Sequence, residues 1–198
     1  KGLILSGGHG MRLRPLSEHF PKQAMPVGNR PIIHYVVDNL INEGIVDIGV
    51  VLSPETAQEI KDTLSVNPWG ARFEWLVQPA PLGLAHAVGL AKDFIGSDSF
   101  VVYLGDNMLG EDISELVQQF KTTGSVSTLT LKAVADPSAS GVAEVDSTGR
   151  VLRVIEKPSQ PKSDLAVVGV YCFTPQIFEM IDVLEPSARG ELEITDAI

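Results

Sequence analysis

The feature that most constrains the fold of this chain is the alternation of short apolar runs with helical patterns in its first half. Strand-like runs cover residues 2–6, 45–53, 72–78 and 100–104, and the last is continuously apolar, as is typical of a strand buried on both faces. The spacing of apolar residues between them predicts a helix opened by Pro31 and further helices over 55–65 and 84–94. This alternation favours an α/β fold in which helices cover both faces of a mostly parallel sheet.

The second half is rich in strands. Strand-like runs lie at 126–136, 141–146, 151–157 and 165–174, followed by a helical pattern over 175–184. Turn residues at 147–149 predict a hairpin between two of these strands. Because no linker or repeat interrupts the chain, we expect a single domain over 1–198, with halves 1–110 and 111–198 forming the two walls of a cleft. The sequence begins at Lys1 and stops inside an expected element, so we expect a C-terminally truncated piece of a longer protein.

Composition is that of an ordinary globular domain, with 44% apolar and 20% charged residues. No apolar run approaches the roughly 18 residues of a membrane span. The N-terminus lacks the pattern of a signal peptide, so a cytoplasmic location with no membrane partner is expected. The one cysteine, Cys172, lies in a strand-like run and is expected to be a buried thiol.

Charge is unevenly distributed along the chain. The net charge of −10 argues against a nucleic-acid partner, because phosphate backbones need a basic surface. Residues 1–30 nevertheless hold five of the 15 basic residues and one of the 25 acidic ones, Glu18. The five are Lys1, Arg12, Arg14, Lys22 and Arg30. A local positive region in an acidic chain suits a small, highly charged anion.

A glycine-rich loop follows the first predicted strand. Gly7, Gly8 and Gly10 would let backbone N–H groups approach a ligand closely, and Arg12 adds a guanidinium that can bind phosphate oxygens. The loop lacks the Gly-Lys-Ser/Thr of a P-loop, and Leu13 stands where a dinucleotide fingerprint has its third glycine. We interpret it as a phosphate-binding loop; a surface turn with solvated arginines is the alternative.

Three further motifs lie at the ends of predicted strands. Asp106 in "YLGDN" could hold Mg²⁺ beside substrate phosphates or could be an ordinary turn residue, and the residues alone leave both open. Gln78 and Gly83 in "QPAPLGLAHA" could receive a base edge and a flat ring, although these residues taken alone favour a plain strand-to-helix turn. Glu156 and Lys157 in "IEKP" are expected to point in alternating directions, toward substrate or as an exposed strand end.

The four histidines show no metal-ligand spacing, and His34 and His86 are expected to be surface or packing residues on helices.

As a set, the motifs resemble the sugar-phosphate nucleotidyltransferase family, most of all its glucose-1-phosphate thymidylyltransferase branch. The resemblance covers essentially all of the chain, with "GGHGMRLRPL", "PK", "QPAPLGLAHA", "GDN", "GVAEVD", "IEKP", "VVGVY" and "GELEITD" in the family's order. It implies a Rossmann-like three-layer α/β/α (GT-A-like) fold with a mostly parallel central sheet and a β-rich sugar-binding extension. The half 1–110 would bind the nucleotide and the half 111–198 the sugar phosphate.

The resemblance also implies a reaction, in which dTTP and glucose 1-phosphate give a dTDP-sugar and pyrophosphate with Mg²⁺ as cofactor. The implied catalytic residues are Arg12, Lys22 and Asp106, with Asp106 as the metal ligand. The implied nucleotide-binding residues are Leu5, Gly7, Gly8, Gly10, Met11, Arg12, Gln78 and Gly83. The implied sugar-phosphate-binding residues are Gly141, Glu156, Lys157, Gly169 and Tyr171.

Several alternatives stay open at this point. UTP could replace dTTP, because the two bases differ by one methyl group, and the module could bind nucleotides without catalysis. An NAD-dependent dehydrogenase is weakened by the missing third glycine, and a homo-oligomeric state is left open. The chain departs from the family's pattern at Met11, where threonine is usual, and at Ser140, where an aromatic residue is common. The family's second metal-binding aspartate would lie beyond "EITD", after the last residue of this sequence.

Overall fold

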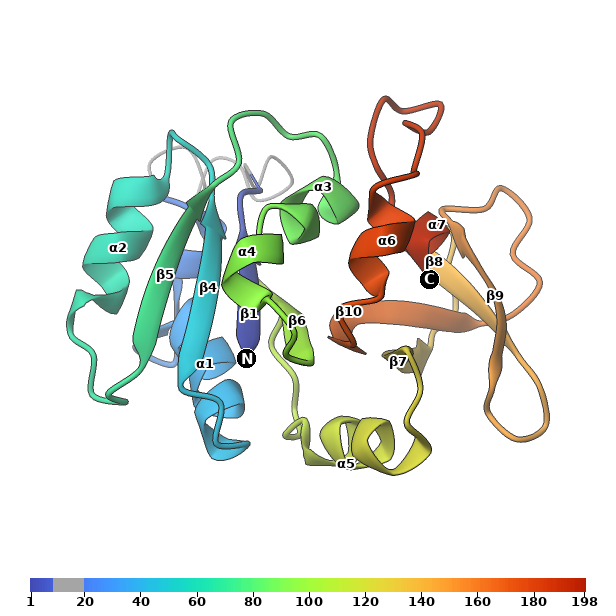
Figure 1. The fold of residues 1–198 in the computed structure, drawn as a ribbon, viewed down its shortest axis with the longest axis horizontal. Coiled ribbons are helices and arrows are strands. Elements are labelled where there is room, and N and C mark those ends of the chain that lie inside the picture. The colour runs from blue at the N-terminus through green and yellow to red at the C-terminus, as the bar shows by residue number, and fades with distance from the viewer. Residues whose placement is uncertain (9–19) are drawn as a thin grey trace.

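The computed structural model describes residues 1–8 and 20–198 and contains a mixed eight-stranded sheet (Figure 1). The strand order is β5-β4-β1-β6-β10-β8-β9, and β7 pairs with β10 beside this path. A separate small ribbon of two strands precedes the first α-helix. The expectation of a mostly parallel central sheet with a β-rich extension is therefore confirmed.

The first half of the chain forms the parallel part of the sheet. Its strands are β1 (Gly2–Ser6), β4 (Asp47–Leu52), β5 (Arg72–Val77) and β6 (Phe100–Leu104). Strand β1 lies between β4 and β6 and is parallel to both, and β5 continues the parallel series beyond β4. Parallel strands end at the same edge of a sheet, so the segments that follow these strands are brought together there.

The second half adds antiparallel strands. They are β7 (Ser127–Ala133), β8 (Gly141–Val145), β9 (Val151–Glu156) and β10 (Leu165–Phe173). Strand β10 pairs with β6 and therefore joins both halves in one sheet. The predicted hairpin is present between β8 and β9, and Gly149 in its turn has φ +83°, which favours glycine.

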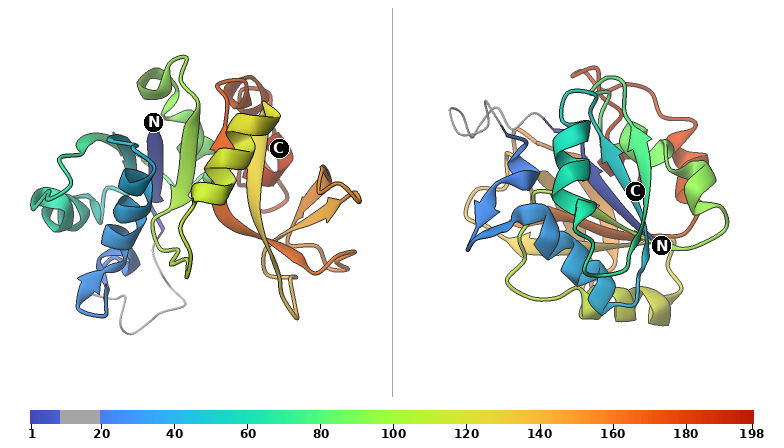
Figure 2. Two further views of the ribbon diagram at one scale, coloured as in Figure 1. Left: turned by 90° about the horizontal axis from the view of Figure 1, so that it is seen from below. Right: turned by 90° about the vertical axis from the view of Figure 1, so that its left-hand side faces the viewer.

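Helices cover both faces of the sheet (Figure 2). One face carries α1 (Ile32–Asn42), α2 (Ala57–Ser65) and α5 (Ser114–Thr123), and the other carries α3 (Leu84–Gly89), α4 (Lys92–Ile95), α6 (Ile177–Ile181) and α7 (Ile194–Ala197). Successive residues of β1 point to opposite faces, so that Ile4 packs with the first group of helices and Leu3 and Leu5 with the second. Three layers with a core on each side follow from this alternation.

Several elements differ from the sequence-based expectation. The helix expected over 84–94 is divided into α3 and α4, with Gly89 as the last residue of α3 and an Ala91 N–H that bonds back three residues to the Val88 carbonyl. Helix α5 was not expected, because few apolar residues mark its buried face. The 3-10 helix η3 (Lys22–Ala24) and the strands β2 (Pro26–Val27) and β3 (Arg30–Pro31) are too short for a periodic signal.

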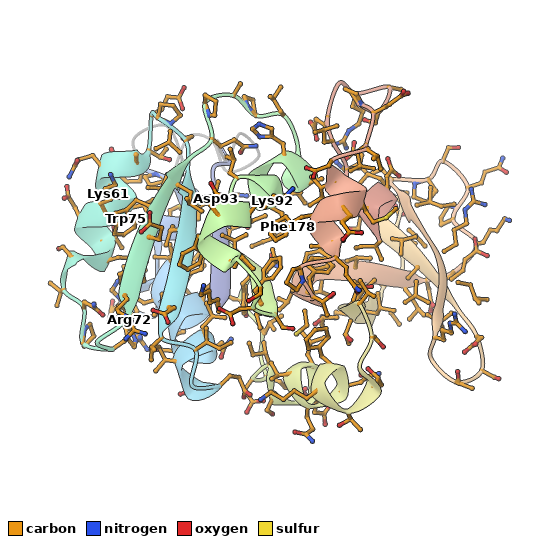
Figure 3. All side chains as sticks on the ribbon, viewed as in Figure 1. Lys61, Arg72, Trp75, Lys92, Asp93 and Phe178 are labelled. Atoms are coloured by element: carbon orange, nitrogen blue, oxygen red, sulfur yellow. The ribbon has the colours of Figure 1, made fainter. Side chains whose placement is uncertain are left out.

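Side-chain contacts hold the helices on the sheet and join the two halves (Figure 3). The Lys61 ammonium of α2 lies 5.7 Å from the centre of the Trp75 ring on β5. Phe178 of α6 stacks on Phe100 of β6, with ring centroids 5.5 Å apart. Within residues 1–8 and 20–198, no helix has the length and apolar character needed to cross a membrane.

Candidate active site

A cavity of about 300 Å³ lies at the carboxyl ends of the parallel strands. The predicted site residues that line it are Leu5, Gly7, Gly8, Lys22, Gln78, Gly83 and Asp106. They come from the segments after β1, β5 and β6 and from η3, which the parallel arrangement places together. A larger hollow of about 950 Å³ lies between β7 and β9, away from these residues. The smaller cavity is therefore the candidate site.

Three predicted residues, Gly10, Met11 and Arg12, lie outside the described residues, as does the rest of 9–19.

Lys22 and Asp106 form an ion pair inside this cavity, between Lys22 Nζ and Asp106 Oδ2. The two side chains are 23% and 27% exposed, so both reach solvent in the cavity. Helix η3 supplies the lysine and the turn after β6 supplies the aspartate. The structure thus brings together a cation that can bind phosphate and a carboxylate that can bind a cation.

The amide of Gln78 has a defined orientation. Its Nε2 donates a hydrogen bond to the Gly83 carbonyl oxygen at 3.2 Å and lies 3.0 Å from His86 Nδ1. A Cβ atom built on Gly7 would lie 3.1 Å from Gln78 Oε1, so a side chain at Gly7 would crowd the amide oxygen. Glycine at position 7 therefore leaves room for the polar end of Gln78 beside the loop.

Gly83 is required by the protein backbone itself. It has φ +104°, and a Cβ at this position would lie 2.6 Å from the Leu192 backbone nitrogen. The Leu192 N–H donates to the Leu82 carbonyl at 2.8 Å, and the Ala85 N–H donates to the Leu192 carbonyl at 3.0 Å. The space beside Gly83 that we expected a flat ring to use is thus filled by the backbone of Leu192, more than one hundred residues later in the chain. Gly83 still lines the cavity.

In the second half, Gly141, Glu156 and Lys157 lie together. Gly141 is opposite Glu156 in the β8–β9 pairing, and a Cβ on Gly141 would lie 3.3 Å from Glu156 Oε2. Lys157 Nζ lies 3.4 Å from Glu156 Oε1, so the two side chains converge. The expectation that they point in alternating directions was wrong, because Lys157 has φ +41° and its backbone leaves the extended conformation.

The other two predicted residues of this half lie on β10. Gly169 has φ +76° and lies against Leu104 and Asn107, where the β10–β7 pairing shifts register. Tyr171 is 4% exposed and stacks on Phe173 with ring centroids 5.6 Å apart. Burial raises the pKa of the Tyr171 hydroxyl, and the negative charge of Glu156 adds to the rise. Tyr171 is a core residue within electrostatic reach of Glu156.

The structure also brings residues to the site that the sequence interpretation missed. Gln23 is 1% exposed, lines the cavity, and its Oε1 accepts no hydrogen bond from any described residue. Asn107 lines the cavity and donates to the Val168 carbonyl of β10. Gln23 directly follows Lys22 in the sequence, and Asn107 directly follows Asp106. This adjacency was the sequence feature from which their place in the site could have been predicted.

The sequence interpretation also missed Arg189, which directly precedes the "GELEITD" motif. Its guanidinium lies 3.2 Å from Glu193 Oε1 through Nε and 3.7 Å from Glu156 Oε1 through Nη1, and it pairs with Glu191. Glu191 lines the cavity of the first half, whereas Glu156 belongs to the second. Arg189 therefore connects carboxylates on both sides of the candidate site.

A family model described as nucleotidyl transferase matches residues 1–198. The chain belongs to this family, and the resemblance inferred from the motifs is confirmed.

Two curated relatives are similar over the whole chain. The low-salt glycan biosynthesis nucleotidyltransferase Agl11 of Haloferax volcanii is 48% identical over 199 residues, which cover 100% of this chain and 56% of the relative. A glucose-1-phosphate thymidylyltransferase of Streptomyces griseus is 43% identical over 199 residues, with the same coverage of 100% and 56%. The chain therefore spans little more than half the length of these relatives.

Solved structures support the same fold. A Bacillus anthracis structure with bound sucrose, described as a glucose-1-phosphate thymidylyltransferase, matches with a TM-score of 0.91 at 39% identity, covering 100% of this chain and 80% of that one. A UDP-glucose pyrophosphorylase with bound UDP-glucose matches with a TM-score of 0.87 at 24% identity, covering 99% and 84%. The second likeness bears on the fold alone.

Proposed function

We propose that the protein to which this chain belongs transfers a nucleotidyl group from dTTP to glucose 1-phosphate, giving dTDP-glucose and pyrophosphate. The observation that carries the proposal is the cavity at the strand ends, where Lys22 and Asp106 meet beside Gln78. The printed names of the Streptomyces and Bacillus relatives support this substrate pair. A soluble cytoplasmic enzyme acting on small molecules is consistent with the family.

In this proposal the first half binds the nucleotide. The base lies near Gln78, whose Oε1 can accept a hydrogen bond from a base N–H, and Gln23 Oε1, which has no hydrogen-bond partner among the described residues, offers a second buried acceptor. Leu5 and the backbone of Gly7 and Gly8 line the way to the triphosphate. For Gly10, Met11 and Arg12, which lie outside the described residues, the proposed role in nucleotide binding rests on the family resemblance.

The second half binds the sugar phosphate. Glu156 accepts hydrogen bonds from sugar hydroxyls, and Lys157, which lies beside it, neutralises the phosphate. Gly141 leaves the Glu156 carboxylate accessible, because a side chain there would crowd Oε2. Gly169 and Tyr171 shape the wall behind these residues from β10.

The proposed chemistry is in-line attack by a phosphate oxygen of the sugar phosphate on the α-phosphorus. The new bond joins that oxygen to the α-phosphorus, and the bond to the β-phosphate oxygen breaks, so that pyrophosphate leaves with the electron pair. The attacking oxygen is already ionised at neutral pH and needs no general base. Lys22 and Arg12 hold the reacting phosphates and stabilise the charge that gathers there, which is the main source of catalysis in such reactions.

The residues around Asp106 fit a magnesium ion that is completed by substrate. Mg²⁺ is bound by one or two carboxylates together with substrate phosphates, and the Asp106 carboxylate reaches the cavity where the phosphates would lie. Among residues 1–8 and 20–198, no group of three or more His, Cys, Asp or Glu side chains could hold a metal without substrate. Asp106 would be the ligand from this chain, and the ion would neutralise phosphate charge when bound.

The test is pyrophosphate release by the full-length protein with glucose 1-phosphate, Mg²⁺ and each nucleoside triphosphate in turn. We expect turnover with dTTP. Turnover with UTP alone would reassign the protein as a uridylyltransferase, and nucleotide binding without turnover would indicate a non-catalytic module. No binding and no turnover with any nucleotide would overturn the proposal.

A further inference from the structure

His86 is placed to control the amide of Gln78, although neither its position on α3 nor its spacing from other histidines marked it as functional. It is partly buried, and its ring nitrogen Nδ1 lies 3.0 Å from Gln78 Nε2. The same Nε2 also donates to the Gly83 carbonyl oxygen at 3.2 Å. In the described structure, both hydrogen bonds of the Gln78 side chain thus involve the Nε2 end of its amide.

These two contacts fix the orientation of the amide and the tautomer of the histidine. A carbonyl oxygen can only accept, so the end of the amide that faces Gly83 must be the NH₂ group. His86 Nδ1 must then accept the second N–H, which places the ring proton of neutral His86 on Nε2. Both hydrogens of Gln78 Nε2 are engaged, and Oε1 is the atom that faces Gly7.

This orientation has a consequence for the base that the cavity accepts. Uracil and thymine carry an N3–H donor, for which Gln78 Oε1 is a ready acceptor. Cytosine N3 instead carries a lone pair that needs a donor, and both N–H groups of the Gln78 amide are already used. A buried polar group left without its partner costs binding energy, so a cytosine at this position is disfavoured.

We infer that His86 is a positioning residue for nucleobase selection: by holding the Gln78 amide with Oε1 toward the cavity, it favours uracil and thymine over cytosine. The inference rests on the proposed function, in that a pyrimidine nucleotide occupies this cavity. His86 acts through Gln78 and does not itself touch the base.

The test compares His86→Leu with His86→Asn in the full-length protein. Leucine removes the acceptor, whereas the Asn side-chain oxygen can take the place of Nδ1. For His86→Leu we expect the KM for dTTP or UTP to rise about 5- to 10-fold and the preference over CTP to fall about tenfold, which is the size of one lost hydrogen bond. The kcat should stay near that of the unsubstituted protein, because the base lies away from the reacting phosphorus, and His86→Asn should restore the preference.

Two controls separate this role from a structural one. Thermal melting shows whether each variant is folded, and His34→Leu makes the same substitution at a histidine that contacts the Thr63 carbonyl on the far side of the sheet. Equilibrium binding of dTTP, UTP and CTP by calorimetry gives the preference without turnover. If folded His86→Leu keeps the full preference, or if His86→Asn fails to restore it, the inference is wrong while the proposed function stands. If the unsubstituted protein binds no nucleotide, both fail together.

Discussion

Lys22 and Asp106 pair across the candidate site although they are 84 positions apart in the sequence. The pair brings into direct contact the cation proposed to bind phosphate, Lys22, and the carboxylate proposed to bind the metal ion, Asp106. The contact between Lys22 Nζ and Asp106 Oδ2 competes with a metal ion at that oxygen and with phosphate at the lysine. Binding of a nucleotide with its magnesium ion is therefore expected to exchange this internal partner for two external ones.

The exchange predicts the effect of replacing Asp106. Asp106→Asn should lower turnover about 10²- to 10³-fold at saturating Mg²⁺, the size of losing one preorganised charge contact. Affinity for dTTP without metal should be retained or rise, because Lys22 loses its internal partner. Pyrophosphate release across a Mg²⁺ titration, with calorimetry in the absence of metal, measures both. Unchanged turnover would show that Asp106 is not the metal ligand.

Removing the other partner should act on the reaction rather than on the fold. Lys22→Met should lower kcat about 10²- to 10³-fold with little change in melting temperature, because the side chain is partly solvated in the cavity. Lys61→Met is the matched control, since Lys61 lies on α2 over Trp75. Equal losses of activity in the two variants would count against a phosphate-binding role for Lys22.

Glu156 provides a test that separates the two substrates. Glu156→Gln keeps the shape but removes the charge, so the KM for glucose 1-phosphate should rise about tenfold, the difference between a charged and a neutral hydrogen-bond acceptor. The KM for dTTP should be unchanged. Glu179→Gln, on the exposed side of α6, should alter neither constant. A rise in the KM for dTTP alone would show that Glu156 acts on the nucleotide and not on the sugar phosphate.

Gly83 should be intolerant of any side chain. Gly83→Ala should destabilise the protein by more than about 2 kcal/mol, because the backbone conformation is one that only glycine adopts readily and the added Cβ would strike the Leu192 backbone. Gly124→Ala is the control: φ there is +61°, and an added Cβ would have no atom of the described residues within 4 Å, so only the left-handed backbone costs about 1 kcal/mol. Urea unfolding of both variants measures the difference, and equal losses would rule out the clash.

Cys172 should be nearly inert in the folded protein. Burial raises the pKa of its thiol to about 12, with a further rise from the charge of Glu43 that Lys121 opposes. At pH 8 the reactive thiolate is therefore scarcer in the folded chain than in the unfolded one, and iodoacetamide labelling should be at least about 10²-fold slower than in urea. Fast labelling without urea would show that β10 opens readily.

The sequence was sufficient for the parallel half of the fold because β1, β4 and β6 are buried strands that read as apolar runs, and the partly exposed edge strand β5 still has a strand-like sequence. Helix α5 escaped prediction since its buried face is marked mainly by Leu116 and Val117 within a polar stretch. The break between α3 and α4 escaped because both pieces continue one apolar pattern.

For the candidate site, the motif with Asp106 was expected at a strand end, and the structure places it on one cavity with Gln78, which follows β5, and with Lys22 of η3, since parallel strands end at one edge. What the sequence could not give was any contact that depends on side-chain orientation. The pairing of Gln78 with His86 and the convergence of Glu156 with Lys157 arise from tertiary packing and from one left-handed residue.

The segment from Ser187 to Glu193 contacts both halves of the candidate site, through Leu192 at Gly83 and through Arg189 at Glu156. A single proteolytic cut within this segment would therefore loosen the base side and the sugar side together. Either substrate alone should therefore slow cleavage of these few peptide bonds by a protease. Because the segment contacts both halves, binding in one half would also stabilise the contacts that the segment makes with the other half.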